Sequence, residues 1–527
     1  MNNHHAAKST SEYMLGVDIG TTSTKAVLFT LDGKVIAQHA VEYPLLCTTP
    51  DMAEQDPQQI YAAVLTSMQV AIVLAKVRLE QIILVSFSAA MHSVIAMDAD
   101  HQPLTNSITW ADNRASVWAT KIRDEHDGHA IYLRTGTPIH AMSPLCKLMW
   151  LRHDHAAIFS RTARFVGIKE YVMHRLFGVW CVDHSIASAT GMFNLKNLDW
   201  DSDALALVGV NAGQLSQPVP TTHQFPALAP ALAQQLGLST TTPFIIGAND
   251  GVLSNLGVNA IAAGQVALTI GTSGAMRTVI DKPITDAAGR TFCYALTENH
   301  WVVGGPINNG GSILRWVRDE LATAETADAQ QRGVNPYDAL MTIAEQVSAG
   351  SEGLLFHPYL AGERAPLWNA DARGSYFGLA LHHGKPHMIR AALEGVIFSL
   401  YSILPAIEEM IAETKTPLEN ATKTMMATGG FARSAVWRQM MADIFNREVV
   451  VPESVESSCL GAAVLGLYAL GRITSLDAVA QMVGSTHKHV PNPENVTIYQ
   501  RLWPIYAAIP KQLMQQYQAL AQFQRQV

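Results

Sequence analysis

The sequence predicts an α/β protein made of two related halves that face each other across a cleft. The chain has 527 residues, which is more than one hydrophobic core usually fills, so we expect two large domains. Strand-like and helix-like patterns alternate along both halves. An apolar-Gly-Thr turn also occurs twice, as Ile19-Gly20-Thr21 and again as Ile270-Gly271-Thr272. This repeat predicts that each half offers one turn to a shared, phosphate-bearing ligand.

In the first half, three strands and a helix precede a fourth strand. Residues 14–19, 25–30 and 34–39 predict the first three strands, with an Asp32-Gly33 turn before the third. Asp56 is a typical N-cap residue and Pro57 suits a first helical turn, so we expect a helix to begin there. The continuous apolar run 82–87 is typical of a strand covered on both faces.

The second half repeats this style. Strands are predicted at residues 266–272, 277–280, 301–303 and 423–427, and helices at 312–321 and 389–410. The small residues Gly461, Ala462, Ala463 and Gly466 predict a helix that packs closely against the second sheet. The expected divisions are a disordered leader (1–13), an N-terminal domain (14–258), a C-terminal domain (259–490) and a C-terminal helical segment (491–527).

Composition and charge exclude several classes of protein. A net charge of -8 argues against a broad nucleic-acid surface, which needs clustered Lys and Arg. The five cysteines are scattered without a CxxC spacing, which is typical of reduced thiols in a cytoplasmic protein. The small-apolar run 459–471 is too short to span a bilayer, and the polar N-terminus lacks the apolar region of a signal peptide. We therefore expect a cytoplasmic protein with no membrane association.

The first turn has residues suited to phosphate and metal. Gly20 permits a tight backbone, and Thr21, Thr22 and Ser23 offer hydroxyl and amide donors to phosphate oxygens. Asp18, at the end of the preceding strand, can accept hydrogen bonds from the water around Mg²⁺. An ordinary Thr-rich hairpin explains this turn equally well on its own. The second copy of the turn favours the phosphate interpretation, and Thr269 opposite Asp18 predicts that the first half holds the metal.

A second pair of stretches matches in the same way. Residues 244–251 end in Asp250-Gly251, whereas residues 425–431 pass through Gly429-Gly430. Alone, Asp250-Gly251 is most often a plain turn. Matched with the other strand ends, Asp250 suits a general base that takes a proton from a hydroxyl.

These stretches resemble the FGGY family of carbohydrate kinases, within the actin-like ATPase superfamily. Seven motifs in order carry the resemblance: residues 18–22, 110–114, 247–251, 270–273, 358–366, 427–434 and 456–463. The resemblance implies two ribonuclease-H-like domains, with ATP and Mg²⁺ in the cleft between them. The implied reaction is phosphoryl transfer from ATP to a hydroxyl of a sugar or polyol.

The resemblance also implies roles for individual residues. Asp250 would be the catalytic base, and Asp18 and Asp250 would hold Mg²⁺ through water. The residues implied for ATP binding are Thr21, Thr22, Ser23, Gly271, Thr272, Gly311, Gly430 and Ser434. The residues implied for substrate binding are Met91, His92, Trp110, Asp112, Arg114, Lys169 and Asp250.

Within the family, the chain resembles the gluconokinase branch most, on residues 91–98, 108–114, 167–171 and 183–191. Gluconate is an acid, so its site should place a cation near the carboxylate, and Arg114, Lys169 and His92 are the candidates. Most such residues are simply solvated or packed in a core. A xylulokinase or another pentose or polyol kinase is the alternative.

Two rivals belong to other classes. An actin- or chaperone-type ATPase shares the duplicated core, but the segment 110–114 suits a small-molecule pocket. A catalytically silent sugar sensor should lack the acid at Asp250. The partners expected are therefore a sugar or sugar acid and ATP, with no nucleic acid. The sequence leaves both a monomer and a homodimer possible.

Overall fold

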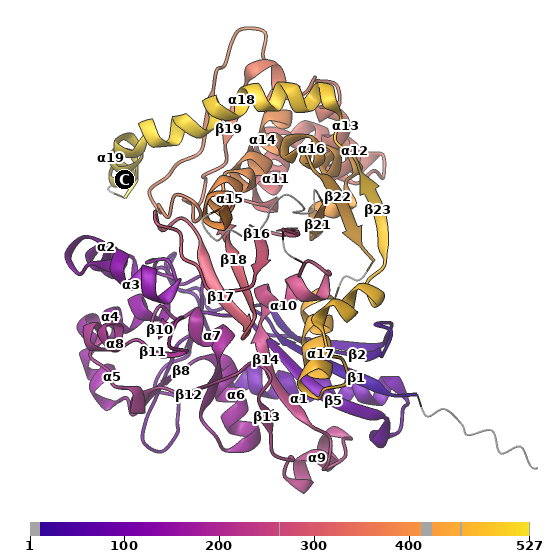
Figure 1. The fold of residues 1–527 in the computed structure, drawn as a ribbon. Helices are drawn as coiled ribbons and strands as arrows, with labels where there is room; N and C mark the ends of the chain where they lie inside the picture. The colour runs from indigo at the N-terminus through magenta and orange to yellow at the C-terminus, as the bar shows by residue number, and fades with distance from the viewer. Residues whose placement is uncertain (1–10, 263, 413–423, 454–455, 526–527) are drawn as a thin grey trace, which may run out of the picture.

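The computed structural model describes residues 11–262, 264–412, 424–453 and 456–525. Figure 1 shows two lobes, one built mainly from the indigo and magenta first half and one from the orange and yellow second half. Each lobe contains one large mixed sheet with helices packed on it. The predicted leader falls largely on residues 1–10, which lie outside the described residues, and Tyr13 already belongs to the first strand.

The first sheet has the strand order β13-β14-β5-β1-β2-β3. β1, β2 and β3 are antiparallel, whereas β5 and β14 run parallel to β1. The bounds are β1 Tyr13–Ile19, β2 Ser23–Thr30, β3 Val35–Glu42, β5 Ile82–Ala89, β13 Gln224–Phe225 and β14 Phe244–Asn249. Helix α1 (Pro57–Ala75) covers one face, and Asp56 caps it as predicted by accepting from the amides of Gln58 and Gln59.

The second sheet repeats this plan in the order β17-β18-β16-β15-β21-β22-β23. β15, β16 and β18 are antiparallel, and β21 and β22 continue in parallel from β15. The bounds are β15 Val266–Ile270, β16 Gly274–Ile280, β17 Phe292–Thr297, β18 His300–Ile307, β21 Thr424–Thr428, β22 Glu448–Pro452 and β23 Ser485–His489. The duplication predicted from the two turns is confirmed.

The register places Asp18 and Thr269 in equivalent positions. Asp18 pairs with Ser88 on β5, and Thr269 pairs with Thr428 on β21. The second predicted match, between residues 244–251 and 425–431, is wrong, because β21 lies beside β15 as β5 lies beside β1. The counterpart of β14 is therefore β22. The parallel strands β5, β14, β21 and β22 are all largely apolar, so their patterns do not distinguish them.

Helix α17 (Ser457–Ala469) corrects another expectation. It packs on β1 and β5 of the first sheet, beside α10 (Asp250–Gly257), rather than on the second sheet. A Cβ on Gly461 would lie 2.1 Å from the carbonyl oxygen of Leu253 on α10, and one on Gly16 would lie 2.1 Å from that of Cys459. Small residues indicate that a helix approaches a neighbour closely, but they do not indicate which neighbour.

The long apolar helix predicted at 389–410 is two helices, α14 (Lys385–Tyr401) and α15 (Leu404–Ala412). Helix 312–321 is likewise α11 (Gly311–Trp316) followed by a π-helical turn, Val317–Leu321. At the C-terminus, α18 (Pro493–Gln512) buries Tyr499 and Tyr506 in the core of the second lobe, and α19 (Met514–Gln524) follows it. By length and composition alone, Pro57–Ala75 and Lys385–Ala412 could cross a membrane, but the latter is mostly buried in the protein core.

A long insertion between β5 and β14 carries most of the predicted substrate residues. Its helices are α2 Ser116–Glu125, α3 Gly128–Thr135, α4 Pro144–Asp154, α5 Ala156–Arg161, α6 Ile168–Phe177, α7 His184–Ser188, α8 Ser202–Val208 and α9 Pro230–Leu236. In the second half, α12 Thr323–Gln331, α13 Pro336–Ala344 and α16 Ala435–Phe445 complete the larger helices. The five cysteines are unpaired, and all but Cys47 are buried.

Candidate active site

The two turns predicted to bind phosphate have related but unequal geometry. The Gly20 amide donates to the carbonyl of Ser23 at 3.0 Å, and the Gly271 amide donates to that of Ser273 at 2.9 Å. The first turn is one residue longer, since Ile19 pairs with Thr24 but Ile270 pairs with Gly274. Thr22, Gly271 and Thr272 are exposed, so their amides and hydroxyls are accessible to a ligand.

The predicted nucleotide residues of the second half surround the second turn. Gly311 donates its amide to the carbonyl of Gly271 at 2.7 Å, and a Cβ on Gly311 would lie 2.7 Å from that same oxygen. No atom of the described residues lies within 4 Å of a Cβ placed on Gly271 or on Gly430, so the described part of the structure leaves the backbone there open to close approach. Ser434 caps α16 by accepting from the Trp437 amide at 3.2 Å.

Two acidic side chains of the first half lie close together at this end of the sheet. Asp18, near the end of β1, accepts a hydrogen bond from the Ser88 hydroxyl at 2.7 Å, and burial raises its pKa. Asp250 begins α10 and accepts from the Gly251 amide at 2.7 Å. Burial raises the pKa of Asp250 to about 6, and the negative charge of Asp18 adds to the increase. In the second sheet, the Thr269 hydroxyl bonds instead to the hydroxyl of Thr428 at 2.9 Å.

This pair of carboxylates fits a hydrated magnesium ion. Mg²⁺ usually takes one or two protein carboxylates and fills its remaining positions with water and substrate phosphates. In the part of the chain that the structure describes, no group of three or more His, Cys, Asp or Glu side chains could hold a metal alone. Two neighbouring, half-buried carboxylates beside the first turn are compatible with an ion that arrives with a nucleotide.

Arg277 on β16 was not singled out from the sequence. Its guanidinium reaches the first half, where Nε and Nη2 lie 3.1 and 3.2 Å from the position of a Cβ on Gly251. The methyl group of Met91 lies 3.2 Å from the same position. The available signal was a cation in a largely apolar strand, four residues after the last residue of the second turn's Gly271-Thr272-Ser273.

Arg364 is a second cation at this interface, within the predicted motif 358–366. Its Nη2 donates to the carbonyl of Ile307 at 3.0 Å, and its guanidinium carbon lies 5.3 Å from the centre of the Trp110 ring. Burial lowers the pKa of Arg364 to about 10, so it stays charged at neutral pH. Among the described residues, its buried Nε has no hydrogen-bond partner, and neither does the buried hydroxyl of Tyr294.

Trp110 lies against Arg364, and His92 lies against Tyr294. His92 is not a cation, although the sequence offered it as one. Its Nδ1 lies 2.7 Å from the carbonyl of Ala189, and its ring packs edge-on against Tyr294. Burial and the charge of Lys147 lower the pKa of His92 to about 3, so the imidazole is neutral. Trp110 donates its indole N–H to the hydroxyl of Thr21 at 2.9 Å, which links the predicted substrate residues to the first turn.

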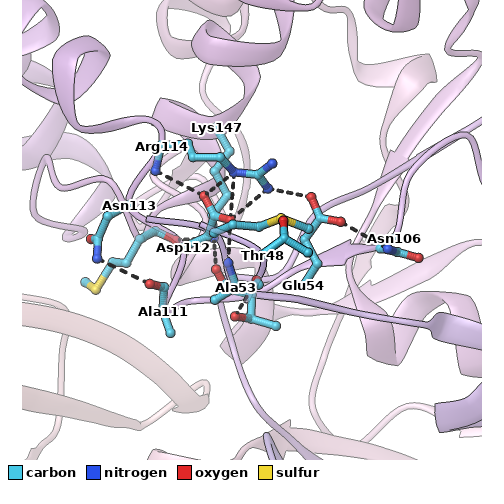
Figure 2. A network of polar contacts seen from close by, with 12 residues as sticks. Thr48, Ala53, Glu54, Asn106, Ala111, Asp112, Asn113, Arg114 and Lys147 are labelled. Carbon is cyan, nitrogen blue, oxygen red and sulfur yellow. Dashed lines mark hydrogen bonds and ion pairs between the residues drawn. The ribbon is translucent and has the colours of Figure 1, made fainter. Parts of the chain in front are cut away.

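Asp112 and Arg114 form a network that Figure 2 shows. Arg114 donates from Nε to both oxygens of Asp112, at 3.1 and 2.9 Å, and from Nη2 to Glu54 at 2.5 Å. Asp112 also accepts from the amide of Ala53 at 2.9 Å. Lys147 lies beside this network, next to Arg114 and Asp112, and is fully buried. Asp112 and Arg114 thus form an ion pair with each other, and Arg114 also pairs with Glu54.

Lys169 is also paired. Its buried ammonium lies 2.8 Å from Asp183 and donates to the carbonyl of Ala248 at 3.2 Å. Asp183 in turn caps α7 by accepting from the Ile186 amide. Lys169 therefore holds β14 in place two residues before Asp250. The three cations proposed from the sequence for a substrate carboxylate are ion-paired (Arg114, Lys169) or neutral (His92).

Both halves of the chain match models of one protein family. Residues 13–257 match the N-terminal domain of the FGGY family of carbohydrate kinases, and residues 266–470 match its C-terminal domain. The chain is 55% identical over 517 residues to a gluconokinase of Bacillus subtilis (strain 168), covering 98% of this chain and 99% of the relative.

Two solved structures from Lactobacillus acidophilus are similar over the whole fold. One is described as a gluconate kinase, with a TM-score of 0.90, and the other as a ligand-bound xylulose kinase, with a TM-score of 0.89. Each is 38% identical and covers 97% of this chain and 100% of its own. With both family domains matched in order, this chain belongs to the FGGY family of carbohydrate kinases.

Proposed function

We propose that this kinase transfers the γ-phosphoryl group of ATP to the terminal hydroxyl of D-gluconate, giving 6-phosphogluconate and ADP. The observation that carries the proposal is the 55% identity to a Bacillus gluconokinase over nearly the full length of both chains. The similar structure described as a xylulose kinase favours a second candidate, D-xylulose, as the acceptor.

The proposed chemistry uses the two carboxylates and the two turns. The acceptor oxygen attacks the γ-phosphorus, the bond from that phosphorus to the bridging oxygen breaks, and Asp250 takes the hydroxyl proton. A pKa raised to about 6 leaves Asp250 ionised at neutral pH and makes it a stronger base than an ordinary aspartate. Thr22 and Thr272, on opposite turns, would donate to the phosphate oxygens as negative charge spreads over them.

We infer that Asp18 and Asp250 hold Mg²⁺ through water. The ion, when bound with ATP, would neutralise charge on the phosphates. We also infer that residues 14–258 bind the sugar and residues 259–490 bind the nucleotide, with α17 packed on the first domain, and that the enzyme is cytoplasmic.

A coupled assay of ADP production tests the acceptor. We expect turnover that depends on D-gluconate, with D-xylulose and glycerol much weaker. Efficient use of D-xylulose with D-gluconate ignored would overturn the proposal in favour of the second candidate.

A further inference from the structure

We propose that Arg277 binds the carboxylate of the acceptor, so that the second half of the chain selects a sugar acid over a neutral sugar. This inference rests on the proposed function, because it requires an acidic acceptor. It assigns the recognition of the acid to β16 rather than to Arg114, Lys169 or His92.

The position of Arg277 places a cation beside the reacting end of the substrate site. Its guanidinium lies against Gly251, the residue that follows the proposed base, and next to the methyl group of Met91. A Cβ at position 251 would crowd the guanidinium of Arg277 in its present position, so Gly251 leaves space for that guanidinium. Arg277 thus reaches from one half of the protein into the sugar site of the other.

Arg277 has no close hydrogen-bonding or ion-pair partner among the described residues, although the carboxylate of Asp250 is near enough for the two charges to interact. In the described ranges, its guanidinium makes no hydrogen bond and no ion pair within 4.0 Å. By contrast, Arg114, Arg290 and Arg390 each pair with a carboxylate at 2.5 to 2.7 Å. A half-buried guanidinium without a partner is costly, and a carboxylate ligand suits its planar fork of donors.

Arg364 is less suited to this selection. It lies within the motif 358–366 that the chain shares with its family, and it is occupied by the Ile307 carbonyl and the Trp110 ring. Its free Nε and the free Tyr294 hydroxyl can instead serve the hydroxyl groups of the acceptor. Arg277 follows the motif 270–273 and lies outside all the shared motifs.

A phosphate oxygen of ATP is the other anion that Arg277 could bind. A pair of ligands that differ only at the acid separates the two possibilities. D-glucitol carries a neutral CH₂OH group where D-gluconate carries its carboxylate. An effect on carboxylate recognition changes the ratio of their dissociation constants, whereas an effect on phosphate changes ATP binding instead.

The test compares the wild-type enzyme with Arg277→Met and Arg277→Lys. Arg332→Met, in an exposed ion pair with Asp328 at the C-terminal end of α12, is the matched control. Isothermal titration gives the dissociation constants of D-gluconate, D-glucitol and ATP, and the coupled assay gives kcat and KM. Loss of a charged hydrogen-bonded pair predicts D-gluconate affinity reduced about 10- to 100-fold by Arg277→Met. D-glucitol and ATP affinities should stay within about twofold, and Arg277→Lys should be intermediate.

Each other outcome overturns a specific step. Unchanged D-gluconate affinity in Arg277→Met, with a wild-type enzyme that uses gluconate, refutes the role of Arg277. Weakened ATP binding with an unchanged gluconate-to-glucitol ratio assigns Arg277 to phosphate. A wild-type enzyme that ignores gluconate refutes the proposed function itself. If Arg277→Met does not fold, Arg277→Lys must still show weakened D-gluconate binding for the proposal to stand.

Discussion

Lys147 connects the loops that carry the predicted substrate residues through hydrogen bonds to their backbone carbonyls. Replacing Lys147 with Met tests how much these hydrogen bonds stabilise the loops. Its ammonium is fully buried and donates to the carbonyls of His92 and Thr109 at 2.7 Å and of Met142 at 2.8 Å. Methionine keeps most of the volume but removes all three donors. The Thr109 carbonyl would retain the Asp112 amide, 3.2 Å away, so the carbonyls of His92 and Met142 lose most.

The cost follows from those two carbonyls. A buried acceptor left without a donor costs about 1–3 kcal/mol, and relief from burying an ammonium offsets part of the sum, which leaves about 3 kcal/mol. For a domain of this size, that corresponds to a decrease in Tm of roughly 6–12 °C. The loss should concentrate in the first domain and should also raise the KM for D-gluconate, because His92 and Trp110 lie on the released loops.

Differential scanning calorimetry and the coupled assay measure both effects. Lys196→Met, an exposed lysine in the same half, is the control and should unfold as the wild type does. A Lys147→Met enzyme with a Tm within about 1 °C of the wild type and an unchanged KM would refute the reasoning, since the carbonyls would then have found other donors.

Three further predictions concern single side chains. Asp250→Asn should reduce kcat by about 10²- to 10⁴-fold while ATP still binds by titration, and near-normal turnover would exclude Asp250 as the base. Gly311→Ala places a Cβ 2.7 Å from the Gly271 carbonyl oxygen and should raise the KM for ATP without changing D-gluconate binding; an equal change in both would assign the damage to folding. Burial raises the pKa of Glu170 to about 7, so the folded state keeps a proton that the unfolded state loses near its ordinary pKa of about 4.3. The wild type should therefore lose stability relative to Glu170→Gln as the pH rises from about 4.5 to 7. The same difference in Tm between the two proteins at about pH 5 and at about pH 7.5 would contradict this.

Local chemistry explains what the sequence could predict. The turns at Gly20 and Gly271 specify their own hairpins, so the duplication and the equivalence of Asp18 with Thr269 follow from short stretches of chain. The cap at Asp56 is equally local. The errors concern contacts between distant segments: α17 crosses to the first sheet, and the partner of Arg114 at Glu54 lies 60 residues away.

Arg277 was missed for the same reason, a contact between distant segments. Nothing within a few residues of Arg277 indicates that its guanidinium lies beside Gly251, because that contact exists only when the two halves meet. Sequence reasoning placed the cations for a substrate acid in the first half, where Arg114 and Lys169 are conspicuous. Both stand next to carboxylates that neutralise them, and only one of these, Asp112, is near in sequence.

The division of charge between the halves has a consequence for the reaction cycle. The first half supplies two carboxylates, Asp18 and Asp250, and the second half supplies the cation Arg277. An acidic acceptor bound to Arg277 with its hydroxyl at Asp250 would therefore bridge the halves, and its binding free energy would favour the closed arrangement. A neutral polyol or water gains no such contact with the second half. The residue that selects the acid would thus also limit ATP hydrolysis by water, since closure that excludes water would depend on the correct acceptor.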